Sequence, residues 1–180
     1  MKQVGVVFKE MTDMKKMTEK SLNEAFAGES MAHMKYLVFS EIAEREGFKN
    51  VARLLRAIAY AEQVHASNHA RNLGLIGKTA DNLMTCIEGE TFEVEEMYPA
   101  YDAIAGLQGE SGAKRSFYYA LEAEKIHAEL YKKAREEVLE GKDMDIPEVY
   151  ICPVCGFTHV GKPPEKCPVC GLGSEKFKKF

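Results

Sequence analysis

Apolar side chains recur every three or four residues through most of the chain, which is the period of one face of an α-helix. The pattern predicts four helices, at residues 18–46, 48–72, 90–107 and 112–139, rich in good helix formers. Gly47, Gly74 and Gly141 follow three of the helix ends, and Pro99 should bend the third helix just past Glu96. Two helix pairs joined by the longer segment 74–89 predict an all-α four-helix bundle with one crossover connection.

Carboxylates and imidazoles interrupt the apolar face of each predicted helix, where burial of a polar group is costly. Two of the helices carry a Glu-x-x-His motif, whose members lie one turn apart and point the same way. The first helix adds one glutamate and the third adds two, again three residues apart. The complete set, in chain order, is Glu29, Glu62, His65, Glu93, Glu96, Glu124 and His127.

This polar set repeats along the chain. The two Glu-x-x-His motifs lie 62 residues apart, and Glu29 and Glu93 lie 64 residues apart. Carboxylates gathered in one core would repel each other and lose hydration unless cations neutralise them. One Glu from each of two helices plus Glu-x-x-His from the other two is the ligand pattern of ferritin-like dimetal proteins, and mixed carboxylate and imidazole ligands suit iron or manganese. One carboxylate is in excess, which would let a metal exchange ligands as its charge changes.

Other residues on the same faces have simpler interpretations. We expect His33 and His69 to be satisfied by hydrogen bonds rather than to bind metal. Tyr36 and Tyr101 are bundle aromatics whose hydroxyls need buried partners, a role that metal-bound carboxylates would fill. We expect Cys86, in the crossover segment, to be a thiol without a role.

The composition changes abruptly after Gly141, where a linker at 141–150 leads into a tail rich in Cys, Pro, Gly and Lys. We therefore expect two domains, residues 1–146 and 147–180. The tail is too short to bury a core unaided, and its two CPVCG motifs predict a four-thiolate metal site. The spacing alone favours structural zinc, whereas a neighbouring redox dimetal site favours iron, a one-electron carrier. The predicted ligands are Cys152, Cys155, Cys167 and Cys170.

The composition narrows the class of protein. The chain has 180 residues, of which 46% are hydrophobic and 29% are charged, a composition typical of globular proteins. Its formal net charge is -4, so it lacks the excess of basic residues that binds nucleic acid. No apolar stretch approaches the roughly 18–20 residues of a membrane span, and the N-terminal apolar patch is too short for a signal peptide. Tightly grouped cysteines fit a reducing compartment. We expect a cytoplasmic protein with no nucleic-acid or membrane partner.

Specific segments of the sequence resemble the rubrerythrin family over nearly the whole chain. They are FAGES at 26–30, EQVH at 62–65, GETFEVEEMYPAY at 89–101, EAEKIH at 122–127 and the two CPVCG motifs. The resemblance implies a ferritin-like domain with a non-haem di-iron centre on the seven carboxylates and histidines above, and a rubredoxin-like domain with one iron on the four cysteines. It also implies that one iron exchanges Glu96 for His65 on reduction, beside tyrosines at Tyr36 and Tyr101.

The activity that the resemblance implies is reduction of hydrogen peroxide to water, in protection against oxidative stress. Electrons would come from NADH through a separate reductase or rubredoxin, and Glu96, His65, Tyr36 and Tyr101 would be the catalytic residues. We expect at least a head-to-tail homodimer in which the tail of one chain approaches the bundle of the other. Two features depart from the family, the N-terminal extension 1–16 and His33.

Other functions stay open at this level. A ferroxidase or iron-handling protein would use the same bundle ligands, although it would gain nothing from a built-in electron carrier. An oxygen-reducing di-iron protein, including an oxygenase of organic substrates, would also fit the ligands. A structural or sensor module with zinc in the tail is the fourth hypothesis.

Overall fold

The computed structural model describes residues 14–180, so the N-terminal extension predicted from the sequence lies almost wholly outside the described residues. The chain divides into two compact units, Met1–Gly77 and Lys78–Phe180. Its mainly helical character and small C-terminal cysteine domain confirm the predicted fold class. None of the helices in residues 14–180 combines the length and the apolar character needed to cross a membrane.

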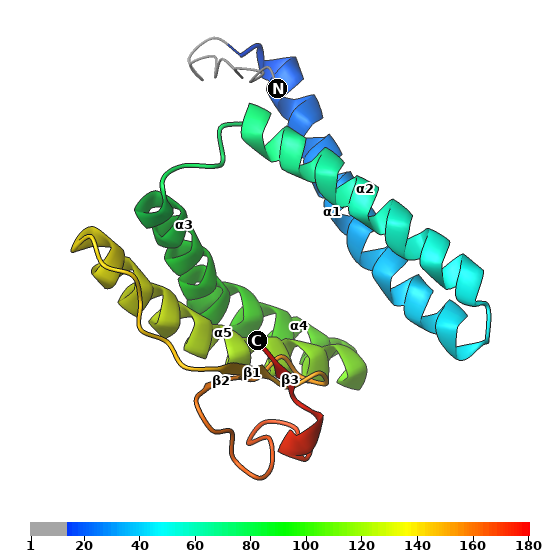
Figure 1. Cartoon of the computed structure of the whole chain (residues 1–180), viewed down its shortest axis with the longest axis vertical. Helices are drawn as coiled ribbons and strands as arrows, with labels where there is room; N and C mark the ends of the chain where they lie inside the picture. The colour runs from blue at the N-terminus through cyan, green and yellow to red at the C-terminus, as the bar shows by residue number, and fades with distance from the viewer. Residues whose placement is uncertain (1–13) are drawn as a thin grey trace. The chain divides into compact units, whose positions relative to one another are not determined.

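The first unit is a hairpin of two helices, α1 (Lys16–Arg45) and α2 (Lys49–Asn72) (Figure 1). Gly47, at φ 88°, makes the turn between them in a conformation that side-chain-bearing residues rarely adopt. The seam consists of small side chains, so the two backbones approach closely. Buried alanines line it: Ala43, Ala52, Ala59, Ala66 and Ala70.

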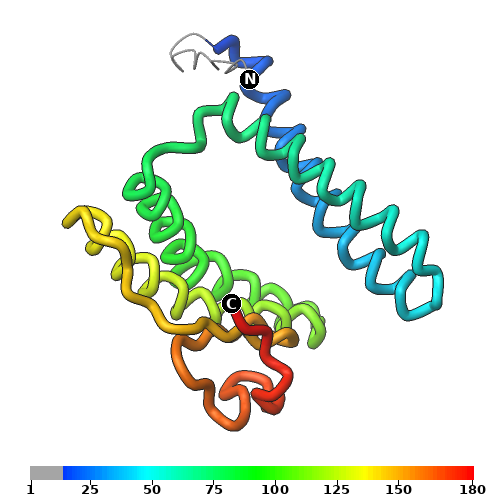
Figure 2. Tube along the Cα trace, in the orientation of Figure 1, coloured from blue at the N-terminus to red at the C-terminus, as the bar shows by residue number. Residues whose placement is uncertain are grey.

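The second unit begins with a nearly continuous helical run, α3 (Thr79–Phe92), a π-helical turn (Glu93–Met97) and α4 (Tyr98–Gln108). Figure 2 shows this run, in green, beside α5 (Ser111–Leu139), in yellow. The predicted crossover at 74–89 is therefore wrong, because helix already begins at Thr79. Gly89 does not end a helix; it lies inside α3, where a glycine costs only about 1 kcal/mol relative to alanine.

A π-helical turn directly precedes Pro99, the residue at which the sequence predicts a bend. Proline has no backbone N–H, so it cannot donate the usual helical hydrogen bond to the carbonyl four residues earlier. Pro99 instead occupies the first turn of α4, where that donor is not needed. Such π turns are frequent at functional sites, and this one carries Glu93 and Glu96.

The tail forms a three-stranded antiparallel sheet in the order β2-β1-β3, from β1 (Val149–Ile151), β2 (Thr158–Val160) and β3 (Lys178–Lys179). Its core is made by the cysteines, and Tyr119 of α5 packs against them. The tail thus belongs to the second compact unit (Figure 1). The domain boundary between residues 146 and 147 stays a prediction.

Candidate metal centres

The four cysteines of the tail gather into one site, with three of them buried and Cys170 half-buried. The Sγ atoms of Cys152 and Cys170 are 3.5 Å apart, and those of Cys155 and Cys167 are 3.4 Å apart. These distances are far too long for a disulfide. They approach the separation of about 3.8 Å between ligands of a tetrahedral metal–thiolate site. The donor set therefore fits a single metal ion.

The backbone builds the two halves of this site in the same way. The amide of Cys152 donates to the Phe157 carbonyl, and the amide of Gly156 donates back to the Cys152 carbonyl. Cys167 and Gly171 repeat this arrangement with Leu172. Gly156 and Gly171 both have φ 78°, which the tight knuckle turn requires. Burial raises the pKa of the Cys155 thiol, so a bound cation is what would hold it as a thiolate.

A first carboxylate–histidine cluster lies on the α1–α2 hairpin and consists of Glu29, Glu62 and His65, whose ligand atoms lie within 4.8 Å of one another. The Nδ1 atom of His65 is 2.9 Å from Oε2 of Glu62 and 3.8 Å from Oε1 of Glu29. The helical spacing of three residues brings Glu62 and His65 together, as expected from the sequence. The His65 side chain is 53% exposed within its unit. We call this group the first cluster.

A second cluster has the same composition and lies in the second unit, with Glu90 on α3 and with Glu124 and His127 on α5. The Nδ1 atom of His127 is 2.5 Å from Oε2 of Glu124 and 3.8 Å from Oε1 of Glu90. Burial, followed by the neighbouring Glu124 carboxylate, raises the pKa of Glu90 to about 7. The cluster thus concentrates negative charge that a bound cation would neutralise.

Glu90 is the residue that the sequence analysis overlooked. The structure places Glu90, rather than Glu93 or Glu96, closest to Glu124 and His127. Glu93 interacts electrostatically with both: burial and the Glu124 carboxylate raise the pKa of Glu93, whereas His127 lowers it. Glu96 is exposed and belongs to no cluster among residues 14–180. The sequence spacing could have indicated Glu90, because Glu29 and Glu90 are 61 residues apart, close to the 62 residues that separate the two Glu-x-x-His motifs.

Helix geometry explains the position of Glu96. At 3.6 residues per turn, Glu93 lies less than one full turn after Glu90 and stays on the same side of the helix. Glu96 is six residues after Glu90, about one and two-thirds turns, so it faces elsewhere. The π-helical turn, which starts at Glu93, widens the helix between Glu93 and Glu96 and changes the register further.

The predicted tyrosines do not reach the carboxylates through any direct hydrogen bond recorded in residues 14–180. Tyr36 is half-buried against Phe39, and Tyr101 is partly exposed and packs on Phe117. Two other tyrosines lie near the second cluster, Tyr98 and Tyr131. Burial raises the pKa of both phenols, and the nearby carboxylates of Glu90 and Glu124 raise it further. Both hydroxyls therefore keep their protons.

The tail contacts the second cluster directly. Nε2 of His127 lies 2.7 Å from Oγ1 of Thr158, at the start of β2. A Cβ added to Gly156 would lie 3.8 Å from the Ala123 methyl group of α5. The tail thus packs on α5 of its own chain. The expected approach of the tail to the bundle of another chain stays a prediction.

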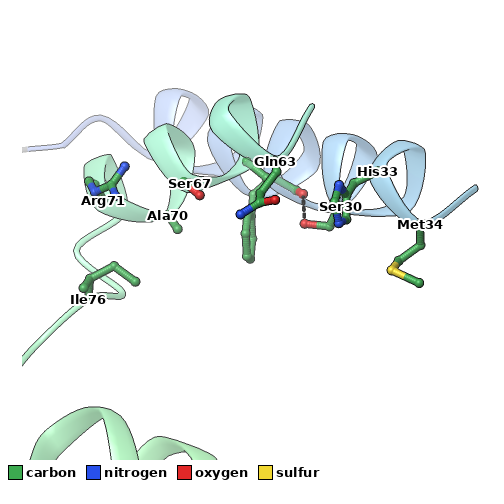
Figure 3. Close-up of a pocket in the computed structure, with 10 residues that line it drawn as sticks. Ser30, His33, Met34, Gln63, Ser67, Ala70, Arg71 and Ile76 are labelled. Carbon is green, nitrogen blue, oxygen red and sulfur yellow. Dashed lines mark hydrogen bonds between the residues drawn. The ribbon is translucent and has the colours of Figure 1, made fainter. Parts of the chain in front are cut away.

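His33 contributes to a pocket on the α1–α2 hairpin instead of to a cluster. The pocket has a volume of about 450 Å³, and Figure 3 shows Ser30 and His33 of α1 near Gln63 of α2, with Arg71 at the other end of the pocket. Nδ1 of His33 donates to the Ala59 carbonyl at 2.7 Å, which agrees with the expectation that this ring is satisfied by a hydrogen bond. His69 also belongs to none of the clusters found in residues 14–180.

Comparison with known proteins identifies the family. The rubrerythrin family model matches residues 20–135, and the model of the rubrerythrin rubredoxin-like domain matches residues 150–178. The chain belongs to the rubrerythrin family. It is 46% identical to rubrerythrin-2 of Clostridium acetobutylicum over 178 residues, covering 91% of this chain and 97% of the relative. It is 33% identical to nigerythrin of Nitratidesulfovibrio vulgaris, covering 91% and 86% respectively.

A solved structure agrees with this. Nigerythrin in its fully reduced, all-ferrous state matches with a TM-score of 0.54 and 29% identity, covering 98% of this chain and 95% of that chain. As a rubrerythrin, the chain is a di-iron protein with a ferritin-like fold and a rubredoxin-like iron domain, and an oxidoreductase of oxidative stress. The two carboxylate–histidine clusters and the four-cysteine site carry the donor atoms that such irons require.

Proposed function

We propose that this rubrerythrin is a peroxidase that reduces hydrogen peroxide to water with electrons relayed through the four-cysteine iron. The observation that most supports this is the 2.7 Å contact between Thr158 of the tail and His127 of the second cluster. A one-electron carrier connected to a carboxylate–histidine site suits redox turnover better than iron storage.

The proposed ligands follow the clusters, with one change from the sequence analysis. Glu90 takes the place that the sequence analysis gave to Glu96, and Glu93 becomes the excess carboxylate that would exchange with a histidine. The proposed di-iron ligands are Glu29, Glu62, His65, Glu90, Glu93, Glu124 and His127. The proposed ligands of the tail iron are Cys152, Cys155, Cys167 and Cys170.

The reaction takes one hydrogen peroxide, two electrons and two protons to two water molecules. When bound, the iron pair would provide both electrons, and the tail iron would replace them one at a time. The chain holds the metals and positions proton donors beside them. The phenol of Tyr98, which stays protonated among the carboxylates, is a suitable donor at the second cluster. Tyr36, Tyr101 and His65 stay predicted catalytic residues.

The proposal extends to partners and location. The electron donor would be a rubredoxin or an NADH-dependent reductase that docks near the half-buried Cys170 edge of the tail. We expect a homodimer or a larger homo-oligomer. We expect a cytoplasmic location, because tightly grouped metal-ligand cysteines fit a reducing compartment.

The test is anaerobic stopped-flow mixing of the fully reduced, iron-loaded protein with hydrogen peroxide and, separately, with oxygen. The proposal predicts faster oxidation by peroxide, and a Glu124→Ala control should lose this reaction because its second cluster is incomplete. Faster oxidation by oxygen would contradict the proposal and favour the ferroxidase or oxygen-reducing alternatives. Zinc in the four-cysteine site of protein purified without oxygen would contradict the electron relay.

A further inference from the structure

The hydroxyl of Thr158 has two partners that together determine its hydrogen-bond direction. Oγ1 lies 3.2 Å from the Gly156 carbonyl and 2.7 Å from Nε2 of His127. A carbonyl oxygen only accepts, so the threonine proton goes to Gly156 and the threonine lone pair is left to accept from the imidazole. His127 therefore carries a proton on Nε2.

We propose that Thr158 is a positioning residue that keeps a proton on Nε2 of His127, so that Nδ1 is the nitrogen presented to a metal, and that joins the cysteine loop to the second cluster. This inference rests on the proposed function in one respect: the proposed function assigns His127 as a metal ligand. Nδ1 faces the carboxylates: it donates a hydrogen bond to Oε2 of Glu124 at 2.5 Å and lies 3.8 Å from Oε1 of Glu90. A metal bound among these groups would take the place of the Nδ1 proton. An imidazole must present an unprotonated nitrogen to a metal, and a partner on the other nitrogen fixes which one it presents.

Burial makes this hydrogen bond costly to lose. Thr158 is only 4% exposed, so water cannot replace its imidazole partner without rearrangement of the tail. The surrounding contacts leave little room for such a movement, because Tyr119 packs on the cysteines and Gly156 approaches Ala123. Thr158 is also only three residues after Cys155. A shift of the cysteine loop would therefore change the orientation of the His127 ring.

The first cluster offers an internal comparison. His65 has the same Nδ1 contacts with two carboxylates, yet its side chain is 53% exposed, against 27% for His127. No hydrogen bond to Nε2 of His65 is recorded among residues 14–180. Within its own unit each histidine faces two carboxylates through Nδ1, and His127 has in addition the Thr158 contact from the tail of the same unit.

The test uses the full-length chain loaded with Zn²⁺, which is diamagnetic, and follows the ¹⁵N-labelled histidine rings by NMR. In the parent protein, His127 should show an Nε2-bound proton that exchanges slowly with water, and His65 should not. Thr158→Val should abolish this protection and weaken Zn²⁺ binding at the second cluster about 10–100-fold, the usual effect of losing such a partner. Thr158→Ser, which keeps the hydroxyl, should restore both. Thr85→Val, which removes an exposed hydroxyl on α3, is the matched control.

The outcomes separate this inference from the proposed function. An unchanged His127 signal and unchanged Zn²⁺ affinity in Thr158→Val would overturn it, as would Thr158→Ser behaving like the valine variant while the tail keeps its zinc. If the valine variant does not fold, the parent spectrum decides, because a His127 proton on Nδ1 contradicts the inference. A parent protein that fails to reduce peroxide refutes the peroxidase proposal and leaves the ring measurement intact.

Discussion

The two carboxylate–histidine clusters share their residue types and their spacing but differ in their surroundings. In both, Nδ1 of the histidine lies close to the glutamate three residues earlier and 3.8 Å from a glutamate of a neighbouring helix. Within the second unit, the second cluster contacts the tail through Thr158, and the additional carboxylate Glu93 lies beside it. Its glutamate Glu90 has a pKa raised to about 7.

The difference shows that a repeated motif does not produce two equivalent sites. Helical periodicity fixes which side chains meet, whereas the tail contributes to the shielding and orientation of His127 within the second unit. An iron bound at the second cluster would be connected to the tail iron through hydrogen bonds of this chain. The predictions below test that asymmetry, from the largest effect to the smallest.

The largest effect should follow Cys155→Ser. We expect iron to fall from about three atoms per chain to about two, with loss of the thiolate-to-iron absorption, because only the tail site is incomplete. Turnover of peroxide with a protein electron donor should be nearly abolished, while dithionite should still reduce the remaining iron. Metal analysis and the visible spectrum measure the change. Retention of the absorption would refute the four-cysteine assignment.

A smaller effect should separate Glu90→Ala from its matched control Glu96→Ala. Glu90→Ala removes a carboxylate that lies within 4.8 Å of the other two ligands, so iron bound in the helical domain should decrease. Glu96 is exposed and outside the clusters, so its variant should keep the parent iron content. Both substitutions are made in the Cys155→Ser variant, which lacks the tail iron, so that the measured iron content reports the helical sites alone. The reverse result would restore the assignment made from the sequence.

This contrast shows what sequence reasoning could reach. The Glu-x-x-His motifs and the cysteine quartet were predictable, because their members lie within one helical turn or one knuckle. Glu90 was not chosen, because a regular helix drawn from Gly89 gives no indication of the π-helical turn at Glu93. The start of α3 was also missed, since Gly89 suggested a helix boundary. The Thr158 contact joins residues 31 apart in two different elements, and no local pattern predicts it.

The smallest effect concerns the contact between the tail and α5. Gly156→Ala and Gly171→Ala should each destabilise the zinc-loaded protein by roughly 1–2 kcal/mol, because both glycines have φ 78°. The alanine at 156 would meet Ala123 at an ordinary 3.8 Å, and nothing lies within 4 Å of position 171. Denaturant unfolding should therefore give similar losses. A much larger loss for Gly156→Ala would mean that the tail packs more tightly on the second cluster than the structure indicates.

The most direct test of the central claim, that the tail serves the second cluster of its own chain, is a complementation experiment. Cys155→Ser lacks the tail site and Glu124→Ala lacks the second cluster, so each variant alone should be inactive. The two are co-expressed with different affinity tags, and oligomers that carry both tags are purified and assayed for peroxide reduction. The account predicts that the mixed oligomers stay inactive, because the intact tail packs on a damaged cluster. Recovery of activity would show that electrons pass between chains and would contradict the account.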